Sequence, residues 1–225
     1  MRDFARQSAL IAHKDLLIEL RSRERLVSTL TFAVLVAIVF SFALDPTVRP
    51  VRIAGAMVWV TILFAGMLGL GRSFTLEQEQ DALVGLLLTP IGRGSLYFGK
   101  FLANLALLVI AAVVVYLVYA LFFQLALGGA AAGLALVTFL GCVGFMALGT
   151  LFSAVAASTR LGDTLLPVVL LPLLIPIVVF GAGATQLLLI GRPLAEVGGN
   201  IRMLAAFDLI FVALCTTVFG TVVEE

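Results

Sequence analysis

One ionisable side chain lies inside the long apolar stretches of this sequence, and it is the first candidate for chemistry. Asp208 sits near the start of the last stretch, whereas the five earlier stretches contain no Asp, Glu, Lys, Arg or His. A charge inside a membrane usually marks an ion pathway, a proton relay or a substrate contact. Asp208 is therefore interpreted either as a carboxylate that reaches headgroup water or as a gate or substrate contact. The scarcity of such groups argues against an ion-coupled transporter and an intramembrane protease.

Side chains that could hold a metal or a haem iron are present but scattered. His13 precedes the first apolar stretch, Cys142 and Cys215 lie in different stretches, and Tyr116 and Tyr119 share one. Haem iron takes His, Cys, Met or Tyr ligands, and a His/Cys metal cluster needs more of these residues than the chain holds. The sequence therefore predicts no metal site, no catalytic residue and no cofactor held by this chain.

The segment from Arg72 to Lys100, RSFTLEQEQDALVGLLLTPIGRGSLYFGK, predicts a short helix at a membrane surface. Acids in a first turn complement the helix dipole, leucines spaced i, i+3, i+4 form one apolar face, and proline ends a helix. The residues that give this pattern over about residues 76–89 are Glu77, Glu79, Asp81, Leu83, Leu86, Leu87 and Pro90. Such a helix could rest on lipid, but its acidic start favours docking in a groove of a cytoplasmic partner.

The residues before Lys100 match the start of a phosphate-binding loop but lack its other requirements. Gly94 to Lys100 has the spacing G-x-x-x-x-G-K. Phe101 stands where such a loop needs Ser or Thr, and Pro90 precedes it where a strand is needed. Because the sequence also offers no large soluble domain, we expect no enzyme activity here and expect ATP hydrolysis in a separate subunit.

The elements that carry these residues are predicted to be membrane-spanning helices. Of the 225 residues, 62% are hydrophobic and 12% are charged, against about 45–50% and about 25% in soluble domains. A spanning helix needs about 20 mainly apolar residues. Six stretches qualify, at about residues 26–44, 53–71, 101–123, 131–157, 165–183 and 204–222. The predicted fold is all-α, one transmembrane domain over residues 1–225, with a cytoplasmic interfacial helix over residues 1–25.

Lysine and arginine positions predict the orientation, because cytoplasmic segments carry the excess of these residues. One side would carry Arg2, Arg6, Lys14, Arg21, Arg23, Arg25, Arg72, Arg93, Lys100 and Arg160, and the other would carry Arg49, Arg52, Arg192 and Arg202. Both termini are therefore predicted to be cytoplasmic.

The fifth stretch is unusual because it contains Pro167, Pro172 and Pro176. Each proline removes a backbone donor, so the helix is predicted to be broken there. It would either move or line a pathway, or form a static kink that its neighbours satisfy. Gly181 and Gly183 are predicted to end the helix, leaving residues 186–190 in an outside loop.

Small residues within two other stretches predict close helix contacts. They are Ala65, Gly69, Gly141, Gly144 and Gly149. Small side chains let membrane helices approach closely.

These segments together resemble a known family. The loop from Arg72 to Lys100 is similar to that of the CcmB family, the membrane subunits of the cytochrome c maturation haem exporter. LLPVVLLPLLIPIVVFGAGA (residues 165–184) resembles the proline-interrupted fifth span of that family, and KDLLIELRSRE (residues 14–24) and Trp59 also fit. The resemblance covers essentially the whole chain, from about Ala9 to the sixth stretch.

The resemblance implies a six-span ABC-2 type permease in the bacterial inner membrane. It implies a separate ATPase subunit, CcmA, and further partners in CcmC, the small protein CcmD and the periplasmic haem chaperone CcmE. Haem would be the substrate and ATP would act through the partner. The permease would either move haem itself or transmit ATP-driven motion that releases the loaded chaperone. The alternatives are a scaffold that transports nothing and a general exporter of lipid or drug.

Overall fold

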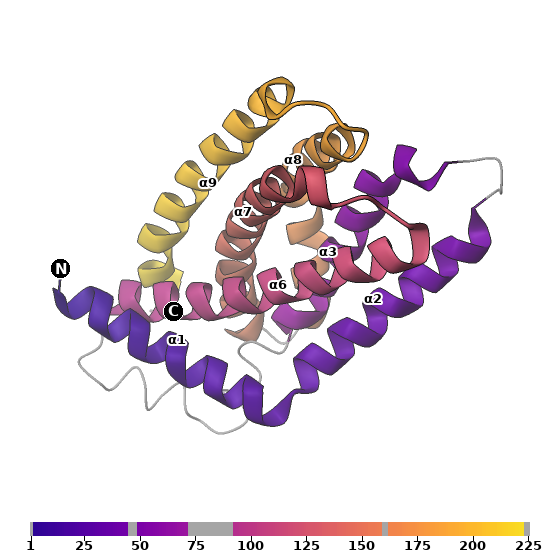
Figure 1. Ribbon diagram of the computed structural model, residues 1–225. Coiled ribbons are helices and arrows are strands. Elements are labelled where there is room, and N and C mark those ends of the chain that lie inside the picture. The colour runs from indigo at the N-terminus through magenta and orange to yellow at the C-terminus, as the bar shows by residue number, and fades with distance from the viewer. Residues whose placement is uncertain (1, 45–48, 72–91, 159–161, 223–225) are drawn as a thin grey trace.

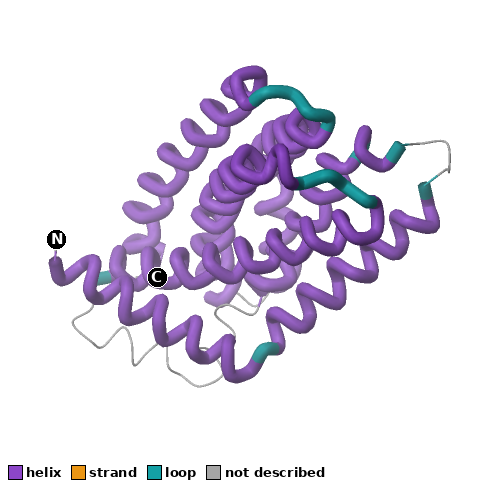
Figure 2. The backbone as a smooth tube through the Cα atoms, in the orientation of Figure 1, coloured by secondary structure: helices purple, strands orange, loops and turns teal. Residues whose placement is uncertain are grey.

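The chain is almost entirely helical in the part that the computed structural model describes, namely residues 2–44, 49–71, 92–158 and 162–222. These residues contain no strand (Figure 2). The α-helices are α1 (Arg2–Ser22), α2 (Glu24–Ala43), α3 (Ala54–Gly71), α6 (Arg93–Phe123), α7 (Ala131–Ser158), α8 (Gly162–Leu189) and α9 (Leu194–Val222), with short 3-10 turns at η1 (Pro50–Arg52) and η2 (Gly128–Ala130).

Six helices of the described residues, α2, α3, α6, α7, α8 and α9, are long and apolar enough to cross a membrane. Lipid offers no hydrogen bonds, so a spanning segment must satisfy its backbone internally, and a helix does this within one segment. The all-α fold with six candidate spans is confirmed. The predicted interfacial helix corresponds to α1, while the predicted helix at about residues 76–89 lies outside the described residues.

The helices α6, α8 and α9 extend well beyond the apolar stretches that predicted them. The helix α6 begins at Arg93 rather than at residue 101, and α9 begins at Leu194 rather than at residue 204. Hydropathy marks the part of a helix that suits hydrocarbon, whereas a helix continues into polar surroundings until its hydrogen bonds end. Polar residues such as Asn200 and Arg202 therefore belong to α9 although they precede its predicted start.

The prediction of a broken fifth span is wrong, because α8 is one continuous helix. Pro167, Pro172 and Pro176 all lie within it, and it continues through Gly181 and Gly183 to Leu189. A glycine inside a helix costs only about 1 kcal/mol relative to alanine, which close packing can offset. Gln186 is consequently part of the last turn of α8 and not of an outside loop.

The centre of the bundle is α3, of which 67% is buried, compared with 17% for α2 and for α9. The helix α3 packs on α8 and α6, and α7 packs on α8 and α9. Figure 1 shows α6 running across the molecule, with α1 and α2 along one side of it and α7, α8 and α9 on the other. The flanking helices α2 and α9 therefore expose the most apolar surface to lipid or to other chains.

A sharp corner joins α1 to α2 (Figure 1). Arg23 separates the two helices and has a left-handed backbone conformation, with φ of 55°. This conformation lies outside the right-handed helical region and changes the direction of the chain. As a result, α1 packs on the first turns of α6, and α2 continues along the same helix.

Candidate functional site

Trp59 packs between three helices in the middle of the bundle. It is buried in α3, and its indole fills the spaces that Gly141 of α7 and Gly181 of α8 leave empty. A Cβ atom at either glycine would collide with the ring. The predicted close contact at Gly141 is therefore present. The missing side chain leaves space for a large aromatic ring from another helix.

Hydrogen bonds that begin at Trp59 extend across four helices. The Trp59 Nε1–H donates to Thr185 Oγ1 of α8 at 2.9 Å. The Tyr116 hydroxyl of α6 lies 3.4 Å from Thr185 Oγ1, and Thr138 of α7 donates to the Tyr116 hydroxyl at 2.9 Å. Buried polar groups require such partners because an unpaired group in an apolar environment is costly. The chain of bonds thus fixes α3, α6, α7 and α8 in one register.

A second set of polar contacts ties the start of α3 to the end of α8. Gln186 accepts a hydrogen bond from the Gly55 backbone N–H at 3.1 Å and donates to the Val51 carbonyl. Gly55 also lies so close to Ala182 that a Cβ atom there would meet its carbonyl oxygen. The helices α3 and α8 are therefore in contact both at Trp59 and at Gly55, near the start of α3.

Asp208 is enclosed by the bundle, so the interpretation that it reaches headgroup water is wrong. The residue is only 7% exposed. Neither of its carboxyl oxygens has a hydrogen-bond partner among the described residues. Gly144 of α7 makes room for it, because a Cβ atom at Gly144 would lie 2.5 Å from Asp208 Oδ1 and 3.0 Å from Ile177 Cδ1. Asp208 is thus a buried acid at the contact of α7, α8 and α9.

Polar contacts also anchor α1 to the first turns of α6. Lys100 is only 2% exposed, and its Nζ lies 3.3 Å from Asp15 Oδ2. The Ser8 hydroxyl donates to the Ser95 carbonyl at 3.2 Å. Gly99 packs against Ile11 so closely that an added Cβ atom would lie 2.7 Å from Ile11 Cβ. Motion at the start of α6 would therefore carry α1 with it.

Replacing Asp15 with alanine is expected to lower the free energy of unfolding by about 1–3 kcal/mol, because the buried Lys100 ammonium loses a charged partner. Chemical denaturation of the purified chain in detergent would measure this change. Lys14→Ala is the matched control, since Lys14 contacts the same carboxylate at 3.1 Å but is more exposed, and such pairs contribute about 0–1 kcal/mol. Equal effects of the two substitutions would contradict the assigned role of Lys100.

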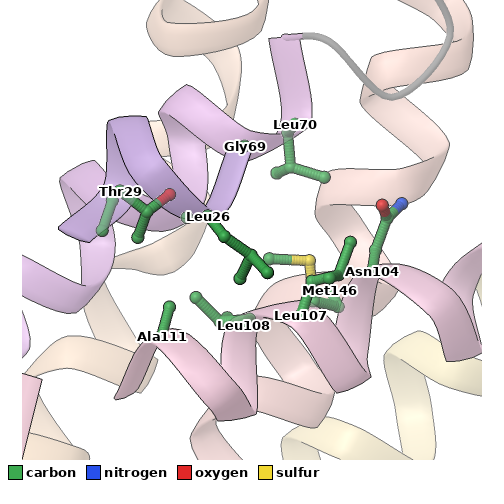
Figure 3. A pocket seen from close by; sticks show the side chains of 11 residues that line it. Leu26, Thr29, Gly69, Leu70, Asn104, Leu107, Leu108, Ala111 and Met146 are labelled. Atoms are coloured by element: carbon green, nitrogen blue, oxygen red, sulfur yellow. The ribbon is translucent and has the colours of Figure 1, made fainter. Parts of the chain in front are cut away.

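A small cavity and an open groove lie between helices of the described residues, and neither holds a cluster of reactive groups. A cavity of about 30 Å³ lies among α2, α3, α6 and α7, with Asn104, Thr29 and Met146 in its wall (Figure 3). An open groove of about 400 Å³ runs between α6 and α7, with Tyr116 and Thr138 in its lining. Both linings are mainly apolar, which suits lipid chains or helix movement rather than catalysis.

The predicted site residues do not form one constellation in the described residues. Glu77, Glu79, Asp81, Leu83, Leu86, Leu87 and Pro90 lie outside the described residues. The three prolines follow one another along α8, and Asp208 lies on α9. No group of three or more His, Cys, Asp or Glu side chains that could hold a metal ion occurs among the described residues. Cys142 and Cys215 are both buried and free.

Sequence reasoning missed the hydrogen-bonded group formed by Trp59, Tyr116, Thr138 and Thr185. Their spacing along the chain carries no signal, because the four residues come from four helices. The one available hint was a single tryptophan in a chain rich in glycine.

Comparison with known proteins gives a consistent result along the whole chain. The model of the CcmB protein family matches residues 6–225. "Heme exporter protein B" of Pseudomonas aeruginosa is 30% identical over 208 residues, which cover 92% of this chain and 91% of that protein. The proteins of the same name from Bradyrhizobium diazoefficiens and Rhodobacter capsulatus are each 29% identical, over 90% and 75% of this chain and 90% and 78% of their own lengths.

Proposed function

The chain belongs to the CcmB family, and from that membership we propose that it is the permease subunit of an ABC transporter complex for haem export and cytochrome c biogenesis. The observation that carries this proposal is the family match over residues 6–225, together with relatives named heme exporter protein B. Six helices suited to a membrane among the described residues agree with a transport subunit that takes its energy from another protein.

The ATPase would act on the helix predicted at about residues 76–89. That segment joins the end of α3 to the start of α6. Force applied there would reach α3, whose Trp59 is locked between α7 and α8, and α6, whose first turns carry α1. ATP binding in the partner would therefore shift the central helices as one body relative to α2 and α9, which are the least buried.

Pro167, Pro172 and Pro176 would set where α8 bends during this motion. Each proline lacks the N–H that would otherwise join it to the preceding turn. Pro172 lines a groove of about 300 Å³ between α3 and α8, together with Leu63 and Ile175. A bend at Pro172 would open or close this groove, which supports a gating role.

Asp208 is proposed to contact the substrate or the gate when α9 moves. Asp208→Asn keeps the size of the side chain but removes its ability to ionise, so the expected change in unfolding free energy is small, about 1.5 kcal/mol or less. Cytochrome c maturation should fall about tenfold if the carboxylate contributes one contact of about 1.4 kcal/mol in the moving state. The level of haem-stained cytochrome c, compared with the exposed control Thr217→Val, would measure the effect. Wild-type maturation in Asp208→Asn would remove Asp208 from the mechanism.

The complex would contain an ATP-binding subunit (CcmA), the haem-handling protein CcmC, the small protein CcmD and the haem chaperone CcmE. It would lie in the bacterial inner membrane with both termini of this chain in the cytoplasm. The excess of lysine and arginine on the segments assigned to the cytoplasm supports this orientation.

A scaffold without transport activity is the second candidate, favoured by the apolar lining of the hollows between the described helices. A release assay separates the two functions. The complex would be assembled with a hydrolysis-deficient ATPase, and the amount of haem-loaded chaperone set free would be measured. The permease requires release to stop, whereas a scaffold would still release the chaperone.

Deletion of the gene tests the proposal as a whole. Loss of c-type cytochromes, restored by the wild-type chain, is the expected result. Normal cytochromes in the deletion strain would favour a general exporter of lipid or drug.

A further inference from the structure

Charges on α1 are sorted between its two faces. Asp15 and Glu19 face the protein, where Asp15 contacts Lys100 and Glu19 accepts a hydrogen bond from the Leu26 backbone N–H. Arg6 and Arg21 point away and have no ion pair among the described residues. The exposed side of α1 therefore carries Arg6 and Arg21 against one exposed acid, Asp3, among the side chains that the structure describes.

The same exposed side carries large apolar residues between the arginines. Arg6, Leu10, His13, Leu17 and Arg21 follow a spacing of three to four residues, which places them on one line along a helix. All five are exposed, and Leu10 is 61% exposed. We call these five residues the outward stripe. Leucines alternating with cations are typical of a helix that lies in a membrane surface, with its apolar groups in the acyl region and its cations at the phosphates.

The position of α1 in the fold agrees with this composition. It leads through the corner at Arg23 into the spanning helix α2. It packs on the first turns of α6, where Ser95 and Lys100 precede the predicted start of the hydrocarbon at residue 101. The helix α1 is thus held at the level where the bundle enters the membrane.

From this placement, we propose that the outward stripe of α1 is a binding surface for the headgroups of anionic phospholipids. Charge complementarity identifies the occupant, because the two arginines of the stripe outnumber Asp3, the one exposed acid on this helix among the side chains that the structure describes. An arginine close to an anionic leaflet strengthens binding by about fivefold. A binding groove for a soluble protein would not require exposed leucines aligned with a bilayer surface. The inference rests on the proposed membrane-embedded permease and adds a lipid class to it.

Fluorescence quenching in vesicles tests the proposal with the full-length chain. Leu10→Trp introduces a reporter on the stripe, and the buried Trp59 of the wild-type chain gives the background. The vesicles would contain brominated phosphatidylglycerol or brominated phosphatidylcholine at equal content. We expect the reporter to be quenched at least about twice as strongly by the anionic lipid, with the preference lost in about 1 M salt, where the screening length falls to about 3 Å.

Two double substitutions assign the preference to the stripe. Arg6→Gln with Arg21→Gln should make the two lipids quench the reporter equally. Arg49→Gln with Arg52→Gln removes the same charge beyond the far end of α2, away from α1, and should leave the preference unchanged. Equal quenching by both lipids in the starting protein would overturn the headgroup preference, and quenching by neither would show that the stripe faces something other than lipid. Normal cytochrome c maturation alongside either result would leave the proposed function intact.

Discussion

Replacing Leu83, Leu86 and Leu87 together with alanine is expected to separate the permease from its ATPase and to abolish cytochrome c maturation. Burying a leucine contributes about 1.5–3 kcal/mol, and truncation to alanine removes much of that contribution. Three truncations would therefore weaken docking by several kcal/mol, and each 1.4 kcal/mol corresponds to about tenfold in affinity. Co-purification of the ATPase from native membranes and haem staining of c-type cytochromes would measure the two losses.

The matched control truncates three leucines that are exposed on the surface of the bundle, Leu117, Leu121 and Leu209. This variant loses the same number of side-chain atoms but should retain the ATPase and the cytochromes. If the ATPase remains bound when Leu83, Leu86 and Leu87 are truncated, the docking helix is wrongly assigned. If binding is lost but maturation persists, ATP-driven motion is not the function of the complex.

Replacing Gly141 with leucine is expected to destabilise the bundle strongly. Even a Cβ atom at this position collides with the Trp59 ring, and adding atoms to a packed core costs about 1–3 kcal/mol or more. Displacement of the Trp59 ring would also break its hydrogen bond to Thr185, which links α3 to α8. Thermal unfolding of the purified chain would show the destabilisation, and the emission of its single tryptophan should shift as the ring becomes exposed.

Gly69→Ala provides the control for this prediction. Gly69 lies in α3 but has no neighbouring atoms within 4 Å of an added Cβ atom. The substitution should be neutral or should stabilise the helix by up to about 1 kcal/mol through its better helix propensity. The double substitution Gly141→Leu with Trp59→Ala should lose less unfolding free energy than the two single substitutions lose in sum, because alanine at residue 59 removes the collision. If the two changes in unfolding free energy simply add, Trp59 does not pack against Gly141 as described.

Sequence alone located the spanning helices because apolar stretches of sufficient length are a direct consequence of the hydrocarbon thickness. It could not locate the ends of α6, α8 and α9, because those ends lie in polar surroundings or among packed neighbours where hydropathy gives no signal. The extension of α8 beyond Gly181 and Gly183 was missed because the expectation that glycine ends a helix describes a lone helix. In the bundle, Trp59 packs against Gly181 and Asn200 donates a hydrogen bond to the Phe180 carbonyl, so neighbouring helices support the last turns of α8.

The sequence indicated which residues make close contacts between helices, but it did not indicate which residues they contact. The small residues at Gly141, Gly144 and Gly149 were identified as contact points, and each does receive a side chain from another helix. Their partners, Trp59, Asp208 and Leu70, could not be assigned because sequence does not specify the rotation of one helix against another. Gly69 was predicted to be a contact point in the same way, but an added Cβ atom there would meet no neighbour within 4 Å.

Both native thiols, Cys142 and Cys215, are enclosed by neighbouring helices. A membrane-impermeant maleimide applied to intact cells should therefore not label the natural chain, and it should label an introduced cysteine only where that residue is exposed outside the cytoplasm. Ala9 and Arg49 lie at opposite ends of the bundle's predicted path through the bilayer, and both are exposed. The native background is thus already suited to topology mapping, and no cysteine needs to be removed beforehand.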